Sequence, residues 1–70
     1  MNYTEIIYTK TDTIATLRLN RPDNMNAFGR KMIKELAHAL KDAEADEKIR
    51  AIILTGTGRA FCTGFDVKEM

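Results

Sequence analysis

Cysteine and proline are nearly absent from this sequence, and each scarcity excludes a class of protein. A single cysteine cannot form an internal disulfide, so the chain is not a disulfide-stapled secreted domain. One proline and four glycines among 70 residues are too few for a disordered or low-complexity segment. No apolar run approaches the roughly 20 residues that a membrane-spanning helix needs, and no basic-then-apolar leader follows Met1. We therefore expect a cytoplasmic protein that does not contact a membrane.

An excess of charge of either sign is also missing. The chain has 11 Lys and Arg against 10 Asp and Glu, a formal net charge of +1. Nucleic-acid-binding domains usually carry a clear basic excess, so we expect no nucleic-acid partner. The 44% hydrophobic and 30% charged residues are typical of a globular α/β domain. A chain of this length buries only about 60% of its unfolded surface, so a core of its own would be marginal.

Three segments are typical of strands and one of a helix. Residues 3–10 are rich in β-branched and aromatic side chains. Residues 14–19 place alternate side chains on opposite faces, and one face of the resulting antiparallel hairpin should be covered. Residues 27–45 change to helical spacing, and the apolar residues 51–55 indicate a parallel strand buried on both faces. The predicted fold class is therefore α/β, in the order strand, strand, helix, strand.

The predicted helix has a start signal and an apolar stripe. Asn26 is the predicted N-cap, and Lys31 with Glu35 would form an exposed pair one turn apart. The stripe that should face the sheet comprises Phe28, Met32, Leu36, Ala39, Leu40 and Ala43, widened by Ile33 and Ala37. Residues 20–26, which include Pro22, should form the loop before this helix.

The glycines after the last strand do not form a nucleotide-binding fingerprint. Gly56 and Gly58 lack a third small residue, because that position holds Phe61, and no Gly-Lys-Ser/Thr follows. Their simpler interpretation is a tight turn. The loop nevertheless follows the carboxyl end of a parallel strand, which is the edge where α/β sheets bind ligands.

Gly64, Phe65 and Asp66 leave two interpretations open. A glycine before a helix start would turn the chain so that the first helical amides point outward, where an anion or oxyanion could bind. Alternatively, Asp66 is only an N-cap and Phe65 only a core residue.

Other reactive residues are few. Cys62 has no predicted base nearby, because the single histidine, His38, is expected on the polar side of the helix, so Cys62 is interpreted as a small buried hydrophobe. One Cys and one His predict no metal site. Among the scattered cations, Arg21 and Lys68 are expected in ligand-facing loops.

Two separated motifs resemble the enoyl-CoA hydratase/isomerase (crotonase) family. They are residues 19–28, Leu-Asn-Arg-Pro-Asp-Asn-Met-Asn-Ala-Phe, and residues 50–70, which contain Gly-Thr-Gly-Arg-Ala-Phe-Cys-Thr-Gly-Phe-Asp. The match runs in order along essentially the whole chain, through Met32, Glu35 and Leu36 of the helix. The resemblance implies the ClpP/crotonase spiral, with residues 1–70 as the N-terminal segment of a single crotonase-like domain.

The resemblance also implies a site. The family stabilises an enolate-like or tetrahedral oxyanion with two backbone N–H groups, the first of which corresponds to the amide of Phe65. Many members carry Ala or Gly at that position, so the large side chain of Phe65 departs from the pattern and could narrow the acyl pocket or stack on an aryl group. The residues implied in coenzyme A binding are Asn24, Met25, Ala27, Thr63, Phe65, Asp66, Val67 and Lys68. Lys68 could neutralise a phosphate, whereas Asn24 stands where the family often has a basic residue.

The function implied by the resemblance is hydration of a 2-enoyl-CoA, with coenzyme A as part of the substrate and no prosthetic group. Isomerase, thioester hydrolase and aryl-CoA dehalogenase reactions remain alternatives, as does a non-catalytic module that binds a partner or nucleotide. The family's second oxyanion amide and its proton-handling acids correspond to positions beyond these 70 residues, so the 70-residue chain alone should be inactive. Family members are commonly trimers or hexamers, and we expect such a homo-oligomer for a full-length parent.

Overall fold

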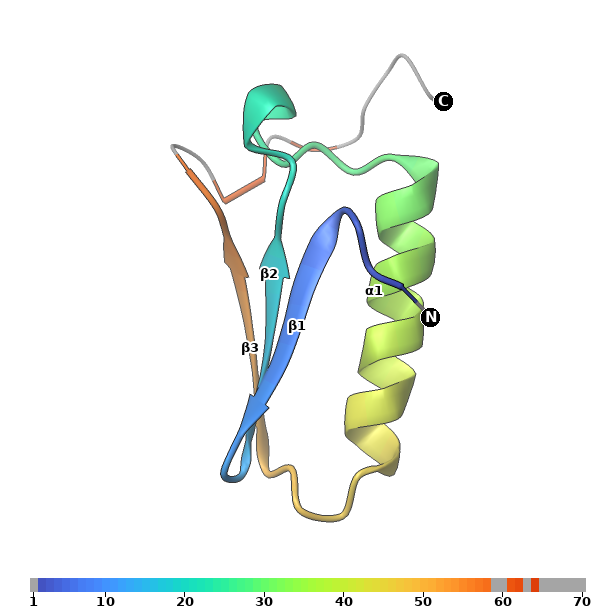
Figure 1. Ribbon diagram of the computed structural model, residues 1–70, viewed down its shortest axis with the longest axis vertical. Coiled ribbons are helices and arrows are strands. Elements are labelled where there is room, and N and C mark those ends of the chain that lie inside the picture. Colours follow the sequence, from blue (N-terminus) through green and yellow to red (C-terminus); the bar gives the residue numbers. More distant parts are fainter. Residues whose placement is uncertain (1, 59–60, 63, 65–70) are drawn as a thin grey trace.

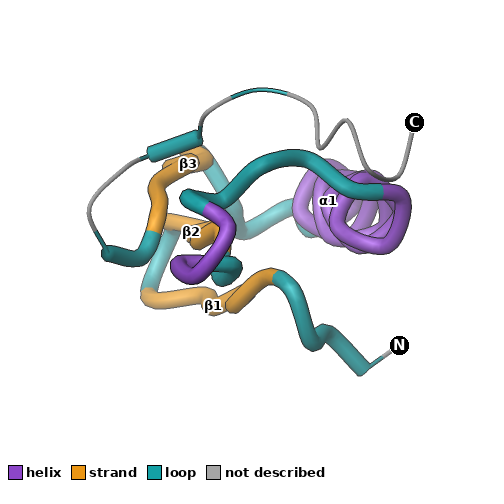
Figure 2. The backbone as a smooth tube through the Cα atoms, turned by 90° about the horizontal axis from the view of Figure 1, so that it is seen from above, coloured by secondary structure: helices purple, strands orange, loops and turns teal. Residues whose placement is uncertain are grey.

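A three-stranded sheet covered on one face by a single helix makes up the structure (Figure 1). The computed structural model describes residues 2–58, 61–62 and 64. Its elements are β1 (Ile6–Thr11), β2 (Ile14–Leu19), a 3-10 turn at Pro22–Asn24, α1 (Arg30–Ala45) and β3 (Ala51–Gly56). Seen from above, α1 lies to one side of the sheet, which gives two layers (Figure 2). The predicted α/β class and element order are confirmed.

The hairpin forms as the alternation of side chains predicts. β1 and β2 are antiparallel, with Ile6 opposite Leu19 and Thr11 opposite Ile14. Asp12 takes a left-handed φ of 54° in the tight turn between them, a conformation that Asp tolerates better than most residues. The second strand has the expected bounds, whereas the first begins three residues later than predicted.

β3 joins the sheet parallel to β2, as predicted, with Ile14 aligned with Ala51 and Leu19 with Gly56. The chain reaches β3 through α1, because a parallel neighbour requires a long crossover connection. Both strands therefore end at the same edge of the sheet, where the loops at residues 20–29 and 57–64 begin.

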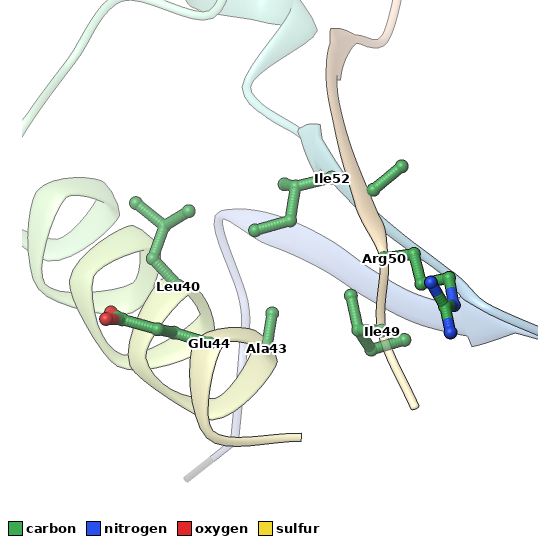
Figure 3. A pocket seen from close by; sticks show the side chains of 7 residues that line it. Leu40, Ala43, Glu44, Ile49, Arg50 and Ile52 are labelled. Atoms are coloured by element: carbon green, nitrogen blue, oxygen red, sulfur yellow. The ribbon is translucent and has the colours of Figure 1, made fainter. Parts of the chain in front are cut away.

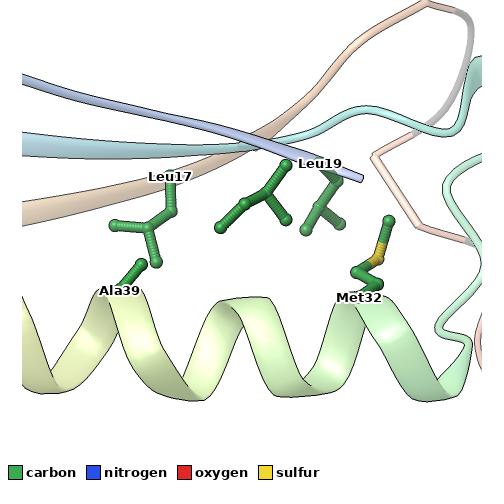
Figure 4. Packing of buried hydrophobic residues seen from close by; sticks show 5 residues of the cluster. Leu17, Leu19, Met32 and Ala39 are labelled. Carbon is green, nitrogen blue, oxygen red and sulfur yellow. The ribbon is translucent and has the colours of Figure 1, made fainter. Parts of the chain in front are cut away.

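The core lies between the hairpin and α1 (Figure 4). Leu17 and Leu19 are fully buried on β2 and pack with Met32 and Ala39 of the helix. Ile6 adds to this cluster from β1. The covered face of the hairpin is thus the one that carries the odd-numbered residues of β2, and its burial against the apolar stripe of α1 provides the hydrophobic stabilisation.

The helix begins later than the sequence predicts, and Asn26 is not its N-cap. α1 starts at Arg30 after an extended N-cap residue, Gly29, which has φ −108° and ψ 176°. Asn26 itself is fully buried with a left-handed φ of 58°, so its backbone cannot enter a helix there.

Only part of the predicted apolar stripe is covered. Met32, Ala39 and Ala43 are buried, whereas Ile33 and Leu40 remain exposed on a patch that also includes Phe28, Leu36 and Ala37.

Glu35 corrects a second prediction, since it is buried and forms no exposed pair with Lys31. Its Oε1 accepts backbone hydrogen bonds from Thr4, Glu5 and Ile6, at 2.9, 2.9 and 3.2 Å. Its Oε2 lies 3.2 Å from the Thr4 hydroxyl. This carboxylate therefore holds the chain just before β1 against the helix, which explains why the strand starts at Ile6.

The expected burial of β3 on both faces is wrong for the described residues. Ile52, Ile53 and Leu54 are 44%, 47% and 46% exposed. The physical reason is that β3 is an edge strand of the described sheet and α1 packs against β1 and β2. An open groove runs between the last turns of α1 and the start of β3 (Figure 3).

Candidate functional site

The predicted ligand-facing loops do meet at the carboxyl ends of the two parallel strands. The first loop, residues 20–29, follows β2, and the second, residues 57–64, follows β3. Asn26 Nδ2 donates to Thr57 O at 2.8 Å, and Phe28 N donates to Gly64 O at 2.7 Å, so the two loops are hydrogen-bonded to each other. Thr57 N also donates to Leu19 O, at the end of β2, at 2.9 Å. The groove in Figure 3 lies at the opposite end of the sheet and does not belong to this edge.

Backbone turns give the first loop its shape. The amides of Asn24 and Met25 bond the carbonyls of Arg21 and Pro22, which closes the 3-10 turn. Met25 and Asn26 then both adopt left-handed φ values, 51° and 58°, which reverse the chain toward α1. The expected coenzyme A residues Asn24 and Met25 are exposed on this turn.

Ala27, the third expected residue of this loop, is buried, and its backbone is engaged within the loop. Its amide donates to the Asn24 carbonyl at 3.1 Å, and its carbonyl accepts from Nη1 of Arg21 at 3.0 Å. The Arg21 side chain is only 14% exposed and its Nε lies 3.9 Å from Oε1 of Glu5. Arg21 lies in the loop where the sequence placed it, and its side chain stabilises that loop from the inside.

The second loop contains two glycines with left-handed φ values. Gly58 has φ 89°, and a Cβ added there would lie 3.1 Å from Cβ of Pro22, so the two loops touch at this point. Gly64 has φ 105°. Cys62 is half-buried against the core, as expected of a small hydrophobe, and its Sγ accepts from the Gly64 amide at 3.3 Å.

The remaining expected site residues fall outside the described part of the chain. They are Thr63, Phe65, Asp66, Val67 and Lys68. The oxyanion and phosphate roles expected for Phe65 and Lys68 therefore stay predictions. His38 is exposed on α1, as predicted, where Nδ1 lies 2.7 Å from the Tyr3 hydroxyl.

A charged cluster that the sequence did not predict pins the hairpin to the end of α1. Lys10 Nζ lies 2.8 Å from Oδ2 of both Asp42 and Asp46, and the Tyr8 hydroxyl donates to Asp42 at 2.7 Å. The hydrogen bonds to the two carboxylates raise the pKa of Lys10, and the bond from Lys10 lowers the pKa of each Asp. Burial, followed by the bond to Asp42, raises the pKa of Tyr8 to about 12. The cluster is structural, because it lies at the helix end away from the two loops.

Other kinds of site find no support in the described residues. No three His, Cys, Asp or Glu side chains gather in a way that could hold a metal ion. None of the described helical segments has the length and apolar character to cross a bilayer.

Known proteins share both the sequence and the arrangement. The family model for enoyl-CoA hydratase/isomerase matches residues 9–70. The 1,2-epoxyphenylacetyl-CoA isomerase of Escherichia coli K12 is 46% identical over 56 residues, which cover 80% of this chain and 21% of that protein. The mitochondrial enoyl-CoA hydratase of Pongo abelii is 46% identical over 61 residues, covering 87% and 21%.

A solved structure is similar to this chain in fold as well as in sequence. The enoyl-CoA hydratase of Mycobacterium tuberculosis H37Rv superposes with a TM-score of 0.91 at 39% identity, over 96% of this chain and 30% of that one. The chain spans about a fifth of the length of these curated relatives. The structural neighbours of the chain have the crotonase fold. Because the family model matches residues 9–70, the chain belongs to the enoyl-CoA hydratase/isomerase family.

Proposed function

We propose that this chain is part of an enzyme that binds an acyl-CoA thioester and adds water to a 2-enoyl-CoA. The observation that carries the proposal is the meeting of two loops at the carboxyl ends of parallel β2 and β3, joined by the 2.7 Å bond from Phe28 N to Gly64 O. Ligands of α/β sheets bind at such an edge. The match to the family over residues 9–70 covers both loops.

The chemical role proposed for this edge is stabilisation of a thioester oxyanion. Hydration of an enoyl thioester places negative charge on the thioester oxygen, and a fixed amide dipole aimed at that oxygen lowers the barrier. We assign this role to the amide of Phe65. Phe65 directly follows Gly64 in the sequence, and the Gly64 carbonyl accepts from Phe28 N at 2.7 Å.

Coenzyme A is proposed to lie along both loops. The residues assigned to it are Asn24, Met25 and Ala27 from the first loop, Thr63 from the second, and Phe65, Asp66, Val67 and Lys68 from the residues that follow it in sequence. The exposed side chains of Asn24 and Met25 are available for contact, whereas the engaged backbone of Ala27 leaves mainly its second carbonyl lone pair. Because the net charge is only +1, we expect individual cations such as Lys68, and not a broad basic face, to contact the CoA phosphates.

Water activation and the second amide are assigned to a longer protein. The chain covers about a fifth of its curated relatives, and the resemblance places these groups beyond residue 70. We therefore expect the 70-residue chain to be inactive alone, and the longer protein to be a cytoplasmic trimer or hexamer. An isomerase remains the second candidate, because the isomerase and the mitochondrial hydratase are equally identical to this chain, at 46%.

Two measurements on the full-length protein test the proposal. Calorimetry with acetoacetyl-CoA should show binding, and crotonyl-CoA should lose the absorbance of its conjugated thioester as water adds. Replacing Lys68 by Ala should weaken acetoacetyl-CoA binding, whereas replacing the exposed Lys48 in the same way should leave it unchanged. Absence of heat at millimolar acetoacetyl-CoA would refute acyl-CoA binding. Binding without hydration would refute the hydratase assignment and favour the isomerase.

A further inference from the structure

Asn26 is a fully buried polar residue that the proposed function does not use. Its side chain lies between the two loops at the site edge. Oδ1 accepts the Arg21 amide at 2.8 Å, within the first loop. Nδ2 donates to the Thr57 carbonyl at 2.8 Å, at the start of the second loop.

The two contacts require an amide side chain. The Arg21 N–H needs an acceptor and the Thr57 C=O needs a donor, and a short carboxamide supplies one of each. The backbone adds a second requirement, because φ is 58° at this position and Asn tolerates left-handed geometry better than most residues. Both requirements together select asparagine over aspartate, which lacks the donor, and over alanine, which lacks both contacts.

The segment that contains Asn26 holds the second loop at both of its ends. Asn26 bonds Thr57 at the beginning of the loop, and Phe28, two residues later, bonds Gly64 near its end. Gly58 packs against Pro22 between these points. Residues 26–28 thus hold the second loop at two points, Thr57 and Gly64.

We propose that Asn26 is a positioning residue, which sets the second loop relative to the first and so orients the bound acyl thioester for reaction. It acts through the backbone of residues 57–64 and does not itself touch the substrate. The proposal rests on the acyl-CoA function proposed above. A small displacement of a positioning group can cost on the order of a hundredfold in rate, because the reacting atoms leave their productive geometry.

The test compares Asn26→Asp, Asn26→Gly and wild type in the full-length enzyme, with crotonyl-CoA as substrate. Asn26→Asp keeps the size and the acceptor but turns the donor into a second acceptor facing the Thr57 carbonyl. Asn26→Gly permits the left-handed φ and removes the side-chain contacts with Arg21 and Thr57. The control is Asn2→Asp, which makes the same charge change on an exposed residue away from the site.

The expected result is a fall in kcat of about tenfold to a hundredfold for both Asn26 variants, with a smaller change in KM. In Asn26→Asp, protonation of the introduced carboxylate would again present one donor and one acceptor, so kcat of this variant should recover relative to wild type as the pH falls. Asn26→Gly and Asn2→Asp should show no such recovery. A simple loss of stability would not restore the rate in acid.

The proposal is overturned if both Asn26 variants retain the wild-type kcat, or if the deficit of Asn26→Asp is the same at every pH. If Asn26→Asp does not fold, Asn26→Gly decides alone: a lower kcat with a near-constant KM supports the role, and an unchanged kcat refutes it. Amide hydrogen exchange provides a readout that needs no activity. An inactive wild type would refute the hydratase function by itself, and unchanged exchange at residues 57–64 in Asn26→Gly would refute the positioning role separately.

Discussion

Replacing Glu35 by alanine is expected to release the chain before β1 from α1. The carboxylate accepts three backbone amides on Oε1, from Thr4, Glu5 and Ile6, and faces the Thr4 hydroxyl on Oε2. Hydrogen bonds to charged groups contribute about 1.5–3 kcal/mol each, and donors left buried without an acceptor add a desolvation cost. Bonds that share one carboxylate are not additive, so the expected total loss is about 3–5 kcal/mol.

Glu35→Gln separates the contribution of the carboxylate charge to stability from that of the hydrogen-bond geometry. The amide oxygen can still accept the three backbone N–H groups, and its NH₂ group can donate to the Thr4 hydroxyl. Neutral hydrogen bonds are about half as strong as charge-assisted ones, so this variant should lose about half as much stability as Glu35→Ala.

Native-state hydrogen exchange of residues 4–6 in the full-length protein measures the effect locally. Each 1.4 kcal/mol corresponds to a factor of about ten, so Glu35→Ala should accelerate exchange there by at least about a hundredfold. Replacing Glu47, an exposed glutamate, by alanine controls for the change in net charge. Equal exchange in the Ala variant and the wild type would show that Glu35 does not hold this segment. Equal acceleration in the Ala and Gln variants would show that the acceptor geometry contributes nothing.

Three further predictions concern the core, the contact between the loops and the charged cluster. Met32→Ala should lower the free energy of unfolding by about 2–5 kcal/mol in urea titrations, because Met32 is fully buried; a cost below about 1 kcal/mol would mean that the core closes around the gap. Gly58→Ala should cost about 1–2 kcal/mol, because φ is 89° and the new Cβ would lie 3.1 Å from Pro22; an unchanged thermal midpoint would contradict this strain. The lowered pKa of Asp42 stabilises the folded state above the carboxylate's ordinary pKa near 4, and this contribution should disappear as the pH falls through the lowered value. Lys10→Met should therefore flatten the loss of stability below about pH 4, and the same acid dependence in both proteins would argue against the ion pair.

The elements that could be predicted from sequence are those with an unambiguous period. Residues 14–19 alternate cleanly, and the structure places β2 at Ile14–Leu19 with its odd-numbered residues buried. The parallel pairing of β3 and the meeting of the two loops follow from the helical crossover, which leaves few other topologies.

The errors arise where a local pattern has two physical solutions. An asparagine just before a helical period is typical of an N-cap, yet Asn26 instead bonds the Thr57 carbonyl, 31 residues away in sequence. A glutamate four residues after a lysine is typical of an exposed pair, yet Glu35 accepts amides from the chain before β1. These two hydrogen-bond partners, Thr57 and the chain before β1, lie much farther away in sequence than the few residues that a helical or strand period spans. They can therefore be identified only in the folded chain.

The uncovered edge of β3 would make a protein that contained only the described strands prone to self-association. Between Ala51 and Gly56 there is no charged residue and no proline, and the isoleucines and leucine of this strand are about half exposed. Sheets normally protect such an edge with a lysine, a proline or a covering element. The backbone groups along the outer side of β3 would offer a template for strands from other copies. Aggregation would limit the concentration at which such a protein stays in solution, even with its hairpin and helix correctly packed.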